Sequence, residues 1–138
     1  MSHVTSPALQ TVPADHSRIR LIALWAVQLA LAGMFLLAGG SKLAGAPAMI
    51  ALFDGIGIGQ WFRYVTGLIE VGSAVTLLVP SIAPFGAMAL VATMTGAVLT
   101  HLFIVGGSPI VPAVLLVGSL TVAWVRRDQI VSALSRMR

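Results

Sequence analysis

The feature that most constrains this chain is a run of twenty residues, Leu21 to Gly40, without a charged side chain. As a helix rising ~1.5 Å per residue, this run can cross the ~30 Å hydrocarbon layer of a membrane. The basic residues before it also resemble the start of a signal peptide, but the run exceeds the ~7 to 15 apolar residues typical of one. The chain is 58% hydrophobic and only 9% charged, against about a quarter charged in soluble domains. We therefore predict an integral membrane protein.

Three further apolar segments follow, and proline or glycine residues separate them. Pro80 ends the first segment, Pro84 opens the second, and the stretch from Gly106 to Pro109 divides the second from the third. The sequence therefore predicts an all-α fold, an integral membrane four-helix bundle within residues 18–125. Its helices are expected at about 21–40, 64–79, 85–105 and 110–125.

The segments outside these helices have distinct compositions. Residues 1–17 are rich in Pro, Ser and Thr, which predicts a disordered N-terminal tail. The connection 41–63 is expected to lie at the membrane interface as a broken, amphipathic turn of helix. Residues 126–138 place apolar side chains on one side and arginines elsewhere, which predicts a basic amphipathic segment on anionic lipid.

The distribution of basic residues predicts the orientation of the chain. With four spans, both ends share one side of the membrane, and that side carries six arginines against Lys42 and Arg63 on the other. Because the richer side is normally cytoplasmic, we expect both the N-terminus and the C-terminus to be cytoplasmic. Trp25, Trp61 and Trp124 fall near the expected interfaces. The partner of this basic charge is thus a lipid bilayer and not a nucleic acid.

The absence of cysteine excludes several kinds of chemistry. Disulfide bonds, thiolate metal sites and thiol–disulfide relays all require a residue that this chain lacks. His101 and Glu70 alone offer too few ligands of the right type, so no metal site is predicted. No residue pattern in the sequence identifies catalytic residues, and their identity stays unknown.

Glu70 is the polar residue that most needs an explanation. A charge at a helix centre costs ~2.5 to 3.5 kcal/mol on insertion scales, so it is expected to face the bundle interior and to have a partner. Arg63 shares its helix face, His101 is expected at a matching depth, and Lys42 is expected at the outer end of the first helix. We predict a candidate polar pocket of Lys42, Arg63, Glu70 and His101 in the outer half of the bundle, in which Arg63 or Lys42 keeps Glu70 ionised. Of these two, Arg63 is expected to be coupled to Glu70, with Lys42 and His101 as the alternative partners. Alternatively, the basic residues reach the headgroups and Glu70 bonds only to its helix neighbours.

These residues also carry a family resemblance. From about Leu24 to Val125 the chain resembles the DoxX-like family of small four-helix membrane proteins. The resemblance rests on single residues and short segments: Phe35, Gly39, Lys42-Leu43, Phe53 to Gly57, Arg63, Gly67, Glu70 and His101. It implies a multi-pass protein of a bacterial-type plasma membrane, which in some relatives is a small subunit of a quinone-linked oxidoreductase complex.

Three functions are open at this point. The first is an accessory subunit that supports a quinone-linked redox or stress-response partner; without cysteine, electron transfer would use a bound quinone or that partner subunit. The second is a small-solute or proton-coupled transporter acting as a homo-oligomer, since four spans without a visible inverted repeat are few for a transporter. The third is a purely structural or assembly role.

Overall fold

A computed structural model describes residues 14–137 of the chain. All regular structure in this part is helical, as predicted, and no strand occurs within it. The expected disordered tail lies largely outside the described residues, except that Ala14 to Ser17 already belong to the first helix. The elements are α1 (Ala14–Ala44), α2 (Pro47–Ile56), α3 (Gln60–Leu77), α4 (Ala83–Thr100), the π-helix η1 (His101–Val105), α5 (Ile110–Val125) and α6 (Arg127–Ser135).

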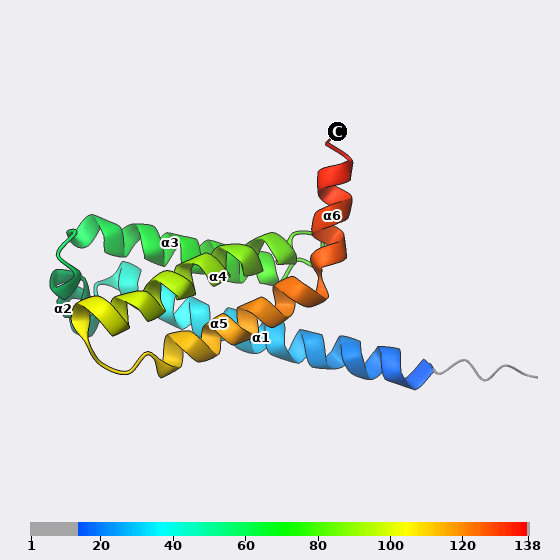
Figure 1. The fold of residues 1–138 in the computed structure, drawn as a ribbon, viewed down its shortest axis with the longest axis horizontal. Coiled ribbons are helices and arrows are strands. Elements are labelled where there is room, and N and C mark those ends of the chain that lie inside the picture. The colour runs from blue at the N-terminus through cyan, green and yellow to red at the C-terminus, as the bar shows by residue number, and fades with distance from the viewer. Residues whose placement is uncertain (1–13, 138) are drawn as a thin grey trace, which may run out of the picture.

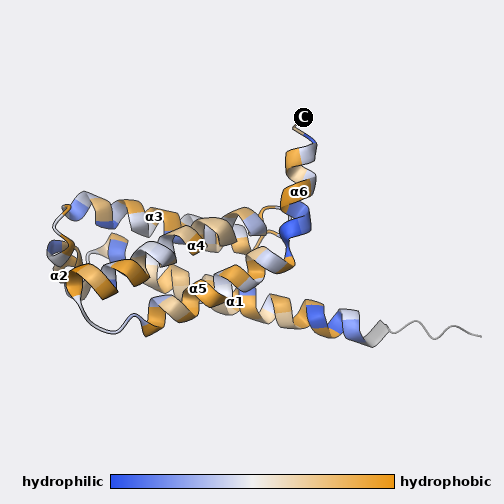
Figure 2. Cartoon of the chain, in the orientation of Figure 1, coloured by the Kyte–Doolittle hydropathy of each residue, from blue (hydrophilic) through white to orange (hydrophobic). Residues whose placement is uncertain are grey.

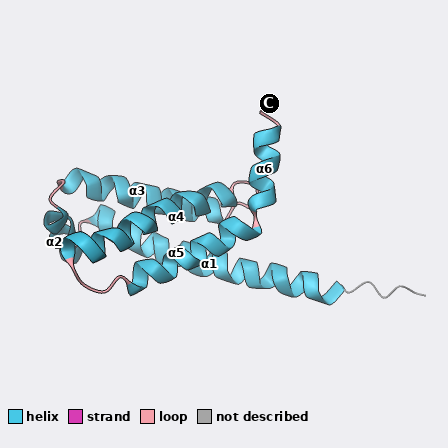
Figure 3. Ribbon diagram, viewed as in Figure 1, coloured by secondary structure: helices cyan, strands magenta, loops and turns pink. Residues whose placement is uncertain are grey.

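Four long helices lie side by side in an elongated bundle (Figure 1). Helix α1 packs on α3, α3 on α4, α4 on α5, and α5 back on α1, so the four form a closed ring. Helix α2 lies across one end of the bundle, which we call the α2 end. Helix α6 projects sideways from the opposite end, which we call the α6 end (Figure 3). The two ends of the bundle therefore differ, because α2 lies across one of them and α6 extends away from the other.

Two elements differ from their predicted form. Helix α1 has 31 residues, which corresponds to about 46 Å of helix, and its first turns extend beyond the bundle at the α6 end (Figure 1). The connection expected to be a broken turn contains the regular helix α2, which has Pro47 in its first turn and ends at Gly57 with φ of 79°. Such a φ suits glycine and stops the helix cleanly. Helix α3 consequently starts early enough to include Arg63.

Apolar residues predominate along the bundle helices (Figure 2), and many of their side chains are exposed. Leu37 is 74% exposed and Phe103 is 78% exposed, and both belong to a large set of exposed aliphatic and aromatic side chains. A soluble monomer rarely carries such a continuous apolar surface, whereas lipid covers it without cost. The molecule is therefore a membrane protein.

Length and composition identify which helices can cross the bilayer. Among the described residues, two qualify as single spans, His16–Ala44 and Ala83–Val105. A third arises if α5 and α6, which meet at 53°, count as one broken span. Helix α3 carries Arg63 and Glu70 and is not among them. Both of these side chains are buried, so its charges face protein rather than lipid.

Candidate functional site

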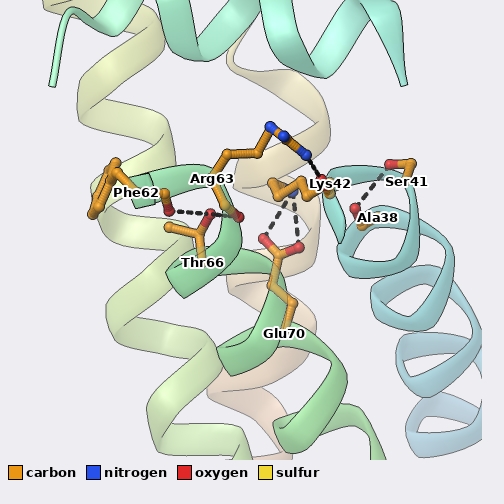
Figure 4. Close-up of polar contacts among 7 residues, drawn as sticks. All are labelled: Ala38, Ser41, Lys42, Phe62, Arg63, Thr66 and Glu70. Atoms are coloured by element: carbon orange, nitrogen blue, oxygen red, sulfur yellow. Dashed lines mark hydrogen bonds and ion pairs between the residues drawn. The ribbon is translucent and has the colours of Figure 1, made fainter. Parts of the chain in front are cut away.

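The site centres on an ion pair between α1 and α3. Lys42 Nζ donates to both carboxylate oxygens of Glu70, at 3.1 Å to Oε1 and 2.8 Å to Oε2 (Figure 4). The Glu70 side chain is 2% exposed and that of Lys42 is 13% exposed. A carboxylate so far from water needs a counter-charge, because leaving it unpaired would cost several kcal/mol. Lys42 is that counter-charge.

Two glycines allow this pair to form. A Cβ atom added to Gly39 would lie 2.8 Å from the backbone oxygen of Gly67, so only glycine allows α1 and α3 to approach this closely. Lys42 lies one turn after Gly39, and Glu70 one turn after Gly67. Because helical side chains lean toward the N-terminus of their own helix, the two side chains of these antiparallel helices lean toward each other. The close crossing and the ion pair are parts of one packing arrangement.

Arg63 has a different role from the predicted one. Its Nε donates to Gln60 Oε1 at 2.6 Å, and its Nη1 donates to the backbone oxygen of Lys42. Figure 4 shows the guanidinium directed to the Lys42 backbone and not to the Glu70 carboxylate. Arg63 starts two turns before Glu70 on the same face, but its long side chain leans away toward the start of α3. The predicted Arg63–Glu70 pair is thus replaced by Lys42–Glu70, and Arg63 caps the end of α1 at the residue that forms the pair.

His101 is the fourth predicted residue, and it lies apart from the ion pair. It opens the π-helix η1, and its Nδ1 is 2.9 Å from the backbone oxygen of Ala97. No bond joins it to Glu70 within the described part of the chain. Single π-helical turns are rare and often occur at functional sites. Here the turn places His101 on the wall of the cavity that also contains Lys42 and Glu70.

This cavity measures about 600 Å³ and lies at the α2 end of the bundle. All four long helices contribute to its wall, and α2 contributes Met49, Leu52 and Phe53. Helix α4 lines it mostly with small residues: Ala92, Thr93, Gly96, Ala97 and Thr100. Most of the wall is apolar, and the polar groups are few. A volume of this size lies within the ~300 to 1,000 Å³ typical of small-molecule sites.

Three of the four predicted residues therefore share one cavity: Lys42, Glu70 and His101 line it, whereas Arg63 does not. Thr66 and Thr93 also line it. Within residues 14–137, no group of three or more His, Cys, Asp or Glu side chains could hold a metal ion.

A second polar cluster, at the α6 end, was not predicted. Gln28 is fully buried; its Nε2 donates to the backbone oxygen of Leu77 at 2.6 Å, and its Oε1 accepts from Arg126 Nε at 2.9 Å. Arg126 also donates to the backbone oxygen of Pro80 at 3.3 Å. The sequence signal was a glutamine inside an apolar span, which needs a partner. The position of Arg126 in the sequence indicates an interfacial charge and not a partner for Gln28. In the structure, however, Arg126 is just 7% exposed.

Comparison with protein families places this arrangement in context. The profile of the DoxX-like family matches residues 26–125, more than two thirds of the chain. The chain belongs to the DoxX-like family. The matched segment contains the Gly39–Gly67 crossing, the Lys42–Glu70 pair and His101, so the candidate site lies within the family domain. Searches of curated proteins and of solved structures each gave no significant match.

Proposed function

We propose that this DoxX-like protein holds a quinone head group in the cavity at the α2 end and serves as an accessory subunit of a quinone-linked redox or stress-response partner. The observation that carries the proposal is a buried ion pair on the wall of a largely apolar cavity. Lys42 and Glu70 are shielded from water, yet they face a space large enough for a substituted ring. A membrane-soluble ligand with a polar head suits such a space.

The ion pair has hydrogen-bonding capacity to spare. A carboxylate has about four lone-pair sites and an ammonium has three hydrogens, whereas each group is engaged here only with the other. Groups buried in this state favour a ligand that completes their hydrogen bonds. A ring oxygen of a quinone can accept the remaining hydrogen of the Lys42 ammonium, and the ring can pack on the apolar wall. The residues present therefore fit the ligand.

The accessory role follows from what the chain itself can supply. It has no thiol, and its polar groups at the site bind and orient rather than carry electrons. A quinone bound here would exchange electrons with a partner subunit, and this protein would position the ring and keep water away from it. The partner is accordingly a redox protein at the same membrane.

The proposed topology has four spans, with both termini on the cytoplasmic side of a bacterial-type plasma membrane. Supporting this, α6 and the extended start of α1 lie at one end of the bundle (Figure 1), and Arg18, Arg20, Arg126, Arg127 and Arg136 lie in these two segments or next to them. Basic residues concentrate on the cytoplasmic side. Reporter fusions after Arg138 should register as cytoplasmic and a fusion near Gly57 as external. An external signal after Arg138 would overturn the orientation and leave the cavity unaffected.

The function is tested by purification in mild detergent, followed by extraction of bound quinones and identification of co-purifying proteins by mass spectrometry. We expect quinone to co-purify with the parent protein. The amount of quinone recovered per protein should be at least severalfold lower in Glu70→Gln. Thermal unfolding of both proteins provides the control for folding. Recovery of neither a quinone nor a redox partner with the folded parent protein would favour a structural role instead.

A further inference from the structure

The hydrogen bond of His101 fixes which ring nitrogen is free. Its Nδ1 lies 2.9 Å from the backbone oxygen of Ala97. Because a carbonyl oxygen can only accept, Nδ1 must carry the hydrogen. In the neutral ring Nε2 is then unprotonated and can only accept. Within residues 14–137 no hydrogen bond reaches Nε2, and His101 lines the cavity. His101, a residue of the cavity wall, therefore carries an acceptor that no donor within residues 14–137 satisfies.

Most of the other polar groups of the wall are also left to accept hydrogen bonds rather than to donate them. Thr66 donates its hydroxyl hydrogen to backbone oxygens one turn back, at 3.1 Å, and Thr93 does the same at 2.9 Å, so each oxygen is left to accept. Glu70 is an acceptor when ionised. The one cationic donor on the wall, Lys42, uses two of its three ammonium hydrogens on Glu70. Of the described lining residues, only Lys42, with its third hydrogen, and the hydroxyls of Thr100 and Ser108 keep a hydrogen free to donate, which is fewer than the acceptors.

From this excess of acceptors we propose that the cavity selects the reduced, hydroxyl-bearing form of its ligand, a para-hydroquinone, with one ring hydroxyl donating to His101 Nε2. This inference rests on the proposed function and specifies the ligand class of the same site. A quinone has carbonyl oxygens that only accept, so it would leave His101 Nε2 unpaired. A hydroquinone supplies two donors. The difference of about one hydrogen bond corresponds to roughly three- to tenfold in affinity.

The experiment compares three ligands on the purified full-length protein in detergent, without oxygen. The ligands are a decyl-benzohydroquinone, the matching decyl-benzoquinone, and the dimethyl ether of the hydroquinone, which keeps the shape but has no donor. We expect the hydroquinone to bind about three- to tenfold more tightly than the quinone. The ether should bind no better than the quinone.

Two substitutions separate the roles of the two ring nitrogens. His101→Asn keeps a donor near the Nδ1 position for the Ala97 oxygen and loses the cavity acceptor. His101→Gln places an oxygen near the Nε2 position and keeps that acceptor. We expect His101→Asn to bind hydroquinone and quinone about equally, and His101→Gln to retain most of the preference. Retention of the full preference by both variants would overturn the assignment to His101.

The ligand comparison on the parent protein does not depend on the folding of either variant. If the quinone binds as tightly as the hydroquinone or more tightly, the selection is wrong and the proposed function stands. If none of the three ligands binds to folded protein, the proposed function fails as well.

Discussion

The two ends of the bundle each contain a buried polar cluster, and the two clusters differ in whether they line a cavity. At the α6 end, Gln28 is fully buried. Its amide nitrogen donates to the Leu77 oxygen, and its amide oxygen accepts from Arg126. Leu77, whose backbone oxygen accepts from Gln28, belongs to the hydrophobic core together with Leu90 and Val122. At the α2 end, Lys42 and Glu70 satisfy only each other and open on a cavity of about 600 Å³.

This difference separates a structural cluster from a binding one. Burial and charge do not separate the two clusters, since each contains a largely buried cationic side chain at one end of an apolar bundle. Polar groups that are all paired within the protein rigidify the fold. Groups with unused donors and acceptors beside an empty volume are available to a ligand. The cavity therefore distinguishes the two ends, because Lys42 and Glu70 line it whereas Gln28 and Arg126 do not.

The largest effect is expected from separating the ion pair. Lys42→Met leaves Glu70 buried without a counter-charge, and we expect the free energy of unfolding in detergent to fall by about 3 to 5 kcal/mol. Adding Glu70→Gln should recover a large part of that loss, because the uncompensated charge is its main cause. Denaturant unfolding of the parent, both single variants and the double variant measures this coupling.

Arg63 provides the control for this cycle. Its guanidinium bonds to the Lys42 backbone and to Gln60 and not to Glu70, so Arg63→Gln and Glu70→Gln should be coupled much more weakly. A stronger coupling for Arg63 than for Lys42 would contradict the pairing described here.

A smaller effect on stability, and none on ligand binding, is expected at the α6 end. Arg126→Met removes the donor to Gln28 Oε1 and to the Pro80 oxygen, which should cost about 1 to 3 kcal/mol. Bound quinone should be unchanged in amount, because this cluster lies outside the cavity. The neighbouring Arg127 is mostly exposed, so Arg127→Met should change stability by less than about 0.5 kcal/mol. A loss of ligand in folded Arg126→Met would show that the two ends are not independent.

The sequence predicted the helical fold and most of the candidate site, since both depend on local pattern. Apolar runs and proline positions indicated the helices, and the insertion cost of Glu70 indicated that it must be buried with a partner. The choice of that partner could not be predicted from helical spacing. It depends on the Gly39–Gly67 approach, which brings Lys42 into reach, and on the direction in which Arg63 leans.

The cavity and the Gln28–Arg126 cluster depend on contacts between distant parts of the chain. A small residue on α4 allows close packing where a neighbouring helix fills the space beside it. Where no helix fills that space, the same residue leaves a cavity. Gly86 shows the first outcome, because an added Cβ atom would lie 1.8 Å from Thr76 Oγ1. Gly96 shows the second. Nothing in the local sequence distinguishes these two glycines.

A small effect on stability is expected from substitutions at Gly96, and these test the binding end most selectively. A Cβ atom added to Gly96 would meet nothing within 4 Å, and replacing a helical glycine by alanine favours the helix by about 1 kcal/mol. Gly96→Ala should therefore be as stable as the parent or slightly more stable, whereas Gly96→Leu should occupy part of the cavity and reduce bound quinone severalfold.

Gly72→Ala is the matched control for Gly96. Gly72 also lies within a helix, an added Cβ atom there meets nothing within 4 Å, and the residue does not line the cavity. Gly72→Ala should gain as much stability as Gly96→Ala in thermal unfolding and should retain the parent's amount of bound quinone. The ratio of bound quinone in Gly96→Leu to that in Gly72→Leu then isolates cavity volume from helix propensity, since both variants add the same side chain to a helix. Equal quinone content in these two folded variants would mean that the ligand binds elsewhere, and the contrast between the two ends would lose its functional meaning.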